Sequence, residues 1–183
     1  MLKKKRVSLR GEKTNPVQLT THEGIVEFYN SLNRNERIKY RYYTSNDAYY
    51  LDYRSLDASY FKTYDETVAY IETLQALGPT ITVVYQEQIA ACWGFARVVP
   101  GVYEAWCLGS KLFNKHPIAT TRTAKFVLEH GAKYIAAHRI QLTVRADNKV
   151  ANNWASVLQF QYEGLMKQFG HDKADYVMFA KYY

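Results

Sequence analysis

The sequence contains no long apolar run and has only two cysteines in 183 residues. No apolar stretch approaches the ~20 residues that a helix needs to cross a bilayer, so we expect no membrane span. Cys92 and Cys107 do not have the spacing of metal ligands, and two thiols cannot form a disulfide framework. We therefore expect two buried, inert thiols on neighbouring strands and no metal site.

The N-terminal stretch "MLKKKRVSLRGEK" is basic but is not followed by an apolar core, so it does not resemble a secretory signal. We therefore expect a protein that is not secreted. Hydrophobic residues make up 48% of the chain and charged residues 22%, which is too apolar for a disordered protein. This composition and length predict one globular domain over residues 15–183, preceded by a basic arm over residues 1–14.

The net charge of +7 is concentrated in that arm. Its cations offer a site for nucleic acid, because binding would release counterions, or for an acidic partner. A solvated terminus with no partner is the alternative interpretation. The candidate binding residues of the arm are Lys3, Lys4, Lys5, Arg6 and Arg10.

Tyrosine is abundant in one segment: residues 40–64 hold eight of the seventeen tyrosines. Tyrosine combines a rigid apolar ring with a polar hydroxyl group, which suits protein interfaces. The simpler interpretation is a β-hairpin that turns at "TSND" (residues 44–47) and whose tyrosines half-cover the domain. A protein-binding surface is the alternative.

The hydrophobic periodicity predicts an α/β protein. Helices are expected from about Thr20 to Leu32 and over 64–77, each opened by a capping box, Thr20 with Glu23 and Thr63 with Glu66. Three strands in an antiparallel meander should follow, then a helix from Pro117, a strand, a helix from Lys149 and a closing hairpin. The predicted strands of the meander and the strand after it are 80–86, 89–99, 102–110 and 139–146.

In this order of elements the chain resembles the GNAT superfamily of acetyl-CoA-dependent N-acetyltransferases. The stretch "NKVANNWASVLQFQYEG" is similar to the family signature N-x-x-A-x-x-x-x-x-x-L-G-F-x-x-E-G. The resemblance implies a mixed, mostly antiparallel central sheet, splayed between two strands and flanked by helices. The residues that match the signature are Asn148, Ala151, Leu158, Phe160, Glu163 and Gly164.

The same resemblance implies where acetyl-CoA would bind, between the splayed strands 102–110 and 139–146. Backbone groups of Leu108 and Gly109 and the side chain of Asn148 would hold the pantetheine arm, and Lys115 and Arg122 would meet the phosphates. Glu104 would be the general base that takes a proton from the attacking amine. The alternatives are structural: Glu104 as an outward-facing strand residue, and Asn148 as the N-cap of the next helix.

Two departures from the family pattern count against catalysis. The glycine-rich pyrophosphate loop, Q/R-x-x-G-x-G/A, is replaced by "LFNKHPIATTRTA", which contains no glycine and places Pro117 where an N–H donor would help. The usual general-acid tyrosine falls at Ala155. A scaffold that binds CoA without turnover is therefore a further alternative.

The region "EAWCLGSKLFNKHPIATTRTAKFVLE" is also similar to a group of acetyltransferase-like proteins of tailed bacteriophages, which carry K-H-P in place of the glycine loop. On this interpretation His116 is a loop residue that caps the following helix, and Trp106 and Trp154 line the core or the cleft.

The narrower resemblance implies a virion or assembly protein, found in the virion or the host cytoplasm, that contacts other virion proteins and needs no cofactor. An active N-acetyltransferase that uses acetyl-CoA to modify an amine is the alternative function.

Overall fold

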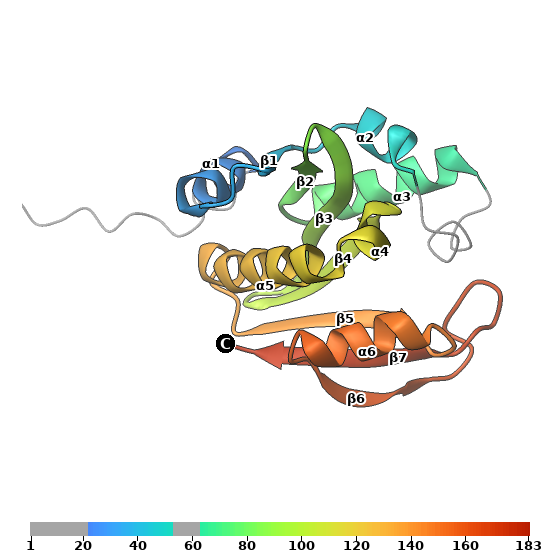
Figure 1. The fold of residues 1–183 in the computed structure, drawn as a ribbon. Helices are drawn as coiled ribbons and strands as arrows, with labels where there is room; N and C mark the ends of the chain where they lie inside the picture. The colour runs from blue at the N-terminus through green and yellow to red at the C-terminus, as the bar shows by residue number, and fades with distance from the viewer. Residues whose placement is uncertain (1–21, 53–62) are drawn as a thin grey trace, which may run out of the picture.

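In the computed structural model, residues 22–52 and 63–183 are described, and one seven-stranded sheet organises them (Figure 1). The strand order is β1-β2-β3-β4-β5-β7-β6; β4 and β5 are parallel and every other neighbouring pair is antiparallel. The elements are α1 (His22–Leu32), β1 (Ile38–Tyr42), α2 (Ser45–Tyr50), α3 (Tyr64–Ala76), β2 (Thr80–Tyr85), β3 (Gln88–Val99), β4 (Val102–Gly109), α4 (Leu112–Lys115), α5 (Pro117–Tyr134), β5 (Arg139–Arg145), α6 (Lys149–Val157), β6 (Gln161–Met166) and β7 (Tyr176–Tyr182).

The predicted α/β class, the meander and the closing hairpin are confirmed. The helix expected at Pro117 begins at that residue, and the Thr63 hydroxyl accepts the Glu66 N–H at the start of α3. The capping box at Thr20 and the basic arm lie outside the described residues. The short helix α4 was not expected from the sequence. No helix in the described parts of the chain is long and apolar enough to cross a membrane.

The predicted hairpin at "TSND" is wrong. β1 does form a strand, but Thr44 is the N-cap of α2, and Asp47 closes a capping box by accepting the Thr44 N–H. Thr-x-x-Asp serves here as a helix start, because Asp47 is buried against Arg41 and Thr82 instead of lying in an exposed turn.

The tyrosines of this segment divide between the core and the surface. Tyr40 and Tyr43 are buried, whereas Tyr42, Tyr49 and Tyr50 are exposed. Tyr53 and Tyr60 lie outside the described residues. The protein-binding surface therefore stays a prediction, and it rests on fewer tyrosines than the composition suggests.

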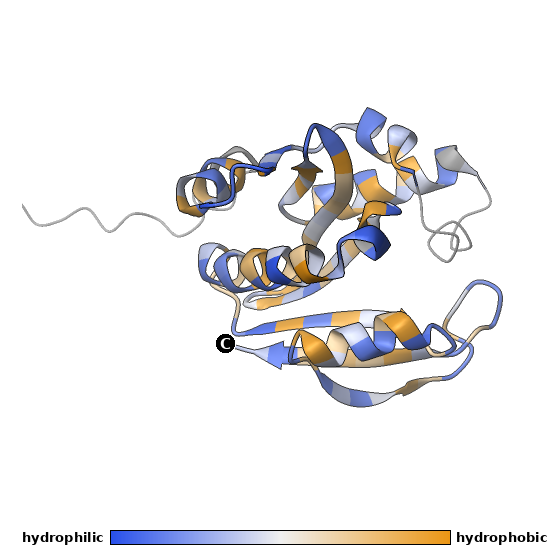
Figure 2. Cartoon of the chain, viewed as in Figure 1, coloured by the Kyte–Doolittle hydropathy of each residue, from blue (hydrophilic) through white to orange (hydrophobic). Residues whose placement is uncertain are grey.

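Helices cover both faces of the sheet. α1, α5 and α6 pack on one face over the larger core, and the Tyr29 hydroxyl of α1 donates to the Val127 carbonyl of α5 at 2.7 Å. α2 and α3 pack on the opposite face, over the smaller cluster around Ile71 and Cys92. Figure 2 shows apolar and hydrophilic residues alternating along α5; its buried residues are Ala124, Val127, Leu128, Gly131 and Ala132.

Gly94 leaves room for an indole ring on the neighbouring strand. It faces Trp106 on β4, and a Cβ added to it would come within 2.6 Å of the indole Cε2 and Nε1 atoms. We expect Gly94→Ala to lower the free energy of unfolding by about 1–3 kcal/mol through overpacking. Gly164→Ala is the matched control in β6, because no atom lies within 4 Å of its added Cβ, and it should change stability by less than about 0.5 kcal/mol.

Urea unfolding of both variants measures the difference. Equal stability of the two alanine variants would show that Trp106 moves aside without cost, and would contradict the tight packing at Gly94.

Candidate active site

Strands β4 and β5 separate shortly after they meet. They pair only through Val102–Arg139, Tyr103–Ile140 and Glu104–Gln141. Beyond Glu104, β4 stays paired with β3 as far as Gly109, while β5 stays paired with β7 as far as Arg145. The predicted splay in the sheet is therefore confirmed, and its gap opens next to Glu104.

A cavity of about 420 Å³ occupies this gap. Alternation along β4 gives it two sides, since successive side chains point to opposite faces of a strand. Trp106 and Leu108 pack with the α3 cluster, whereas Ala105 and Cys107 pack with the core beneath α5 and α6. The cavity therefore reaches both faces of the sheet, and we call its two ends the α3-side mouth and the α6-side mouth.

The α3-side mouth gathers acidic, hydroxyl and aromatic side chains. Glu104 lines it and accepts a hydrogen bond from the Thr143 hydroxyl at 3.2 Å. Tyr70 of α3 and Tyr176 of β7 also line it. Burial raises the pKa of both tyrosines; the charge of Glu104 adds to the rise at Tyr70, and Arg145 opposes it at Tyr176. Both hydroxyls therefore keep their protons at neutral pH.

The loop between β6 and β7 completes this mouth with Phe169, Gly170 and His171. Arg145 holds the loop, because its guanidinium pairs with Asp172 at 2.5 Å and with Asp147 at 3.1 Å. Tyr70, His171 and Tyr176 are not among the site residues predicted from the sequence. His171 and Tyr176 belong to the "GHDKADY" turn and Tyr70 to α3, and their contact with the cavity depends on tertiary structure.

At the α6-side mouth Asn148 has the structural role that was the alternative to cofactor binding. It is the N-cap of α6, with Oδ1 accepting the Ala151 N–H at 3.0 Å, and it also lines the cavity. Asn152 secures the same turn by donating to the carbonyls of Arg145 and Asn148. Asn148 and Asn152 thus fix the start of α6, and because Oδ1 of Asn148 is used by the cap, its Nδ2 nitrogen is the side-chain atom left for a ligand.

Trp154 connects α6 to α5 at this mouth. Its indole N–H donates to the Thr121 hydroxyl at 3.2 Å, and its ring meets Trp93 edge-on with 6.3 Å between ring centroids. Both Trp106 and Trp154 line the cavity, as the cleft-wall interpretation expects. Ala155, at the place of the usual family tyrosine, is buried and also lines it.

The predicted phosphate ligands lie elsewhere. Lys115 and Arg122 are exposed and border a separate groove beside α5, together with Arg34. α4 occupies the place of the glycine loop, and Pro117, which has no N–H, opens α5. The structure thus brings Glu104, Leu108 and Asn148 to one cavity, while Lys115 and Arg122 line a different surface.

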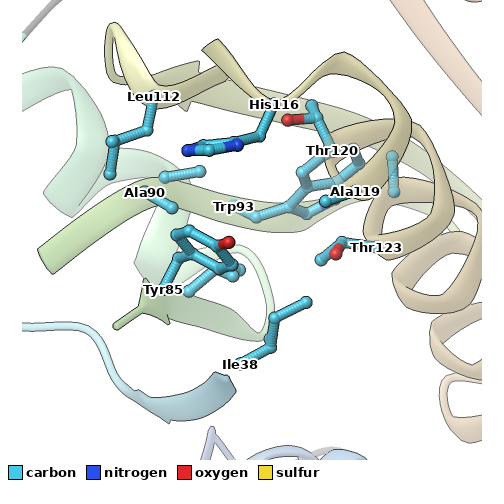
Figure 3. A pocket seen from close by; sticks show the side chains of 12 residues that line it. Ile38, Tyr85, Ala90, Trp93, Leu112, His116, Ala119, Thr120 and Thr123 are labelled. Carbon is cyan, nitrogen blue, oxygen red and sulfur yellow. The ribbon is translucent and has the colours of Figure 1, made fainter. Parts of the chain in front are cut away.

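His116 occupies the N-cap position of α5, but its side chain makes no capping hydrogen bond. Its ring instead packs on Tyr85 with 5.0 Å between centroids, at the side of a small apolar cavity of about 30 Å³ between α5 and the sheet (Figure 3). That volume has room for about one water molecule, so this cavity is too small to hold a cofactor such as acetyl-CoA.

Cys92 is buried, and burial raises the pKa of its thiol to about 12, which fits the expected inert thiol. Cys107 lines the main cavity. In the described residues no group of three or more His, Cys, Asp or Glu side chains comes together as a metal site.

Glu163 of the signature has a structural role in this chain. Its carboxylate accepts two hydrogen bonds from Arg139, at 2.7 and 2.5 Å, and one from the Tyr182 hydroxyl. The hydrogen bonds from Arg139 are the main reason that the pKa of Glu163 falls to about 2. This pair joins β6 to β5 across β7.

The pH dependence of stability should report this pair. Because the folded pKa lies below the ordinary carboxyl value of about 4.3, the stabilisation is complete above that value and is lost as pH falls towards 2. Wild type should therefore lose more unfolding free energy than Glu163→Gln between about pH 4.5 and pH 2. Thermal unfolding across this range tests it, and parallel curves for the two proteins would contradict it.

No protein-family model matches this sequence, and no curated protein matches it. Solved structures do match its fold. A GNAT-family acetyltransferase from Bacillus anthracis superposes with a TM-score of 0.65 at 17% identity, covering 81% of this chain and 96% of that protein. The Salmonella typhimurium acetyltransferase that modifies the N-terminal serine of ribosomal protein L7/L12 gives the same values.

A putative Salmonella typhimurium acetyltransferase, yncA, was solved with its cofactor acetyl-CoA; it matches at a TM-score of 0.57 and 13% identity, covering 80% of this chain and 94% of its own. At these identities the likeness concerns architecture. The chain has the fold of the GNAT acetyltransferases.

Proposed function

We propose that the protein is an N-acetyltransferase that transfers the acetyl group of acetyl-CoA to a primary amine. The observation that carries this proposal is the cavity that passes through the splayed sheet beside Glu104. The acetyltransferases that share the fold, one of them solved with acetyl-CoA, support the same choice.

The α6-side mouth fits the pantetheine arm of acetyl-CoA. β4 has left β5 beyond Glu104, and Leu108 and Asn148 line the gap, whereas Gly109 is not among the residues that line it. Ile118 and Ala119 provide the first N–H groups of α5 for phosphate, since Pro117 has none. Lys115 and Arg122 border the separate groove outside that helix, so they are not part of the α6-side mouth.

When bound, acetyl-CoA supplies the thioester carbonyl that an amine attacks. In this proposal Glu104, which lines the cavity, takes the proton that the ammonium group must lose, directly or through a water molecule. The hydroxyls of Tyr70 and Tyr176 keep their protons at neutral pH and are the donors at this mouth for the departing thiolate. They replace the hydroxyl group that Ala155 lacks.

Thermal unfolding with and without acetyl-CoA tests the binding step. Ligand at about 100 times its Kd should add about 2.7 kcal/mol, a rise of several degrees in Tm. Release of free CoA thiol on addition of primary amines tests the transfer. A saturable rise in Tm without thiol release would mean that the protein binds acetyl-CoA but does not transfer the acetyl group. The absence of both effects would contradict the proposal.

A virion or assembly protein with a degenerate cofactor site is the second candidate, and it rests on the narrower sequence resemblance. The contact between Trp154 and Thr121 favours only the degenerate cofactor site, because this contact ties α6 to α5 at the cofactor side of the cavity. If acetyl-CoA raises the Tm of Thr121→Val but not that of the wild type, the contact between Trp154 and Thr121 is what prevents the cofactor from binding.

A further inference from the structure

The α3-side mouth contains one carboxylate and no cationic lysine or arginine. Among the described residues that line the cavity, Glu104 is the only acidic side chain, and none is lysine or arginine. An ammonium group is therefore attracted to this mouth, whereas a carboxylate on the same ligand would be repelled by Glu104 and would find only the His171 ring and hydroxyl groups, with no lysine or arginine to pair with.

The nearby guanidinium of Arg145 does not change this balance. It acts on Tyr176 but is already paired with the carboxylates of Asp147 and Asp172. These pairs hold the pKa of both aspartates below the ordinary value. Two carboxylates on one guanidinium leave no positive charge to attract a third.

Aromatic side chains line the α3 side of the cavity together with Glu104. Tyr70, Trp106, Phe169 and Tyr176 all line the cavity. Phe169 meets Tyr176 edge-on with 5.4 Å between centroids, and Gly170 allows the loop to lie against that ring, since a Cβ added there would be 2.9 Å from Tyr176 Cε2. Such rings bind the flat faces of other aromatic groups and the positive charge of an ammonium.

We propose that the acceptor is an aromatic primary amine, an arylalkylamine with no carboxylate beside its amino group. The ammonium group binds at Glu104, and the aryl group lies among Tyr70, Phe169 and Tyr176. This proposal rests on the transferase function proposed above and specifies its substrate class. It predicts that aromatic amino acids, which carry a carboxylate beside the amino group, are poor acceptors.

The test compares three acceptors that differ by one feature each: 2-phenylethylamine, phenylalanine and hexylamine. With saturating acetyl-CoA, kcat/KM for 2-phenylethylamine should exceed that for phenylalanine by about 100-fold or more, because the unpaired carboxylate opposes Glu104. It should exceed that for hexylamine by about tenfold. Quenching of tryptophan fluorescence by 2-phenylethylamine without acetyl-CoA provides a readout that does not depend on turnover.

A variant that adds the missing cation sharpens the test. Tyr70 is half exposed, so Tyr70→Arg is accommodated at the mouth and should narrow the preference for 2-phenylethylamine over phenylalanine by tenfold or more. Tyr50→Arg is the matched control, because Tyr50 is exposed and does not line this cavity; it should leave the preference as in wild type.

Each outcome decides one of the two proposals. If phenylalanine or hexylamine is acetylated with the same kcat/KM as 2-phenylethylamine, the proposed acceptor class is wrong, and the proposed transferase function is unaffected. Absence of acetylation of all three, together with absence of acetyl-CoA binding, overturns the transferase. Fluorescence quenching by 2-phenylethylamine in that case would still support the mouth as an arylalkylamine site.

Discussion

Glu104→Gln is expected to lower kcat/KM for amine acetylation by about 100- to 1,000-fold near pH 7, the range of loss for a general base. Glutamine keeps the size of the side chain and can still accept the Thr143 hydrogen bond, but it cannot take a proton. The fold and the affinity for acetyl-CoA should be unchanged, since Glu104 lies at the α3-side mouth.

The pH–rate profile separates this role from a structural one. An alkylamine has a pKa near 10, close to that of lysine. As the pH rises towards that value, the neutral fraction of the amine therefore grows about tenfold for each pH unit. The variant should therefore regain activity as pH rises, because less of the amine needs a base. Wild type should gain less over the same interval.

Two further variants serve as controls for Glu104. Glu36→Gln removes one exposed carboxylate outside the cavity and should not affect the rate. Thr143→Val removes the hydroxyl group that donates to Glu104. It should lower kcat/KM less than Glu104→Gln does, because the base itself remains. Unchanged turnover in Glu104→Gln, with acetyl-CoA binding intact, would return Glu104 to the alternative of an outward-facing strand residue.

The sheet could be predicted from the sequence because its signals are local. The short turn at Pro100–Gly101 specifies that β3 and β4 form an antiparallel pair, and Pro117 specifies a helix start. The splay was predicted only through the family resemblance. The pairing confirms it, since parallel contact between β4 and β5 ends at Glu104.

The site could be predicted only in part, because several of its side chains come from segments that tertiary packing brings together. Glu104 and Asn148 lie on regular elements and were found. Tyr70 reaches the cavity from α3. His171 reaches it from a loop that Arg145 holds through Asp172, and these two ion-pair partners are 27 residues apart in the sequence. No local pattern encodes that ion pair.

The error at "TSND" has the same origin. Thr44 and Asp47 suit a turn as well as a capping box. The helix is selected by Arg41 and Thr82, which bury the carboxylate of Asp47, and Thr82 is 35 residues away along the chain. The choice therefore depends on partners that a short window of sequence does not include.

Asp47→Ala is expected to give the largest loss of stability, about 3 kcal/mol, at the lower end of the range for breaking a buried ion pair because Arg41 is partly exposed. The Asp47 carboxylate accepts hydrogen bonds from two Arg41 nitrogens, from the Thr44 N–H and from the Thr82 hydroxyl at 2.6 Å. Alanine leaves the hydroxyl of Thr82, which is fully buried, and the cap of α2 without this acceptor.

Glu87→Ala is the control, since Glu87, in the turn between β2 and β3, also pairs with a cation of β1, Lys39, but does so at the surface, where both side chains are more than half exposed. An exposed pair contributes at most about 1 kcal/mol, so urea unfolding should separate the two variants by about 2 kcal/mol or more. A loss at Asp47 no larger than at Glu87 would mean that solvent replaces the acceptor. The strand-to-helix switch at Thr44 would then need another cause, because α2 could form without its buried carboxylate.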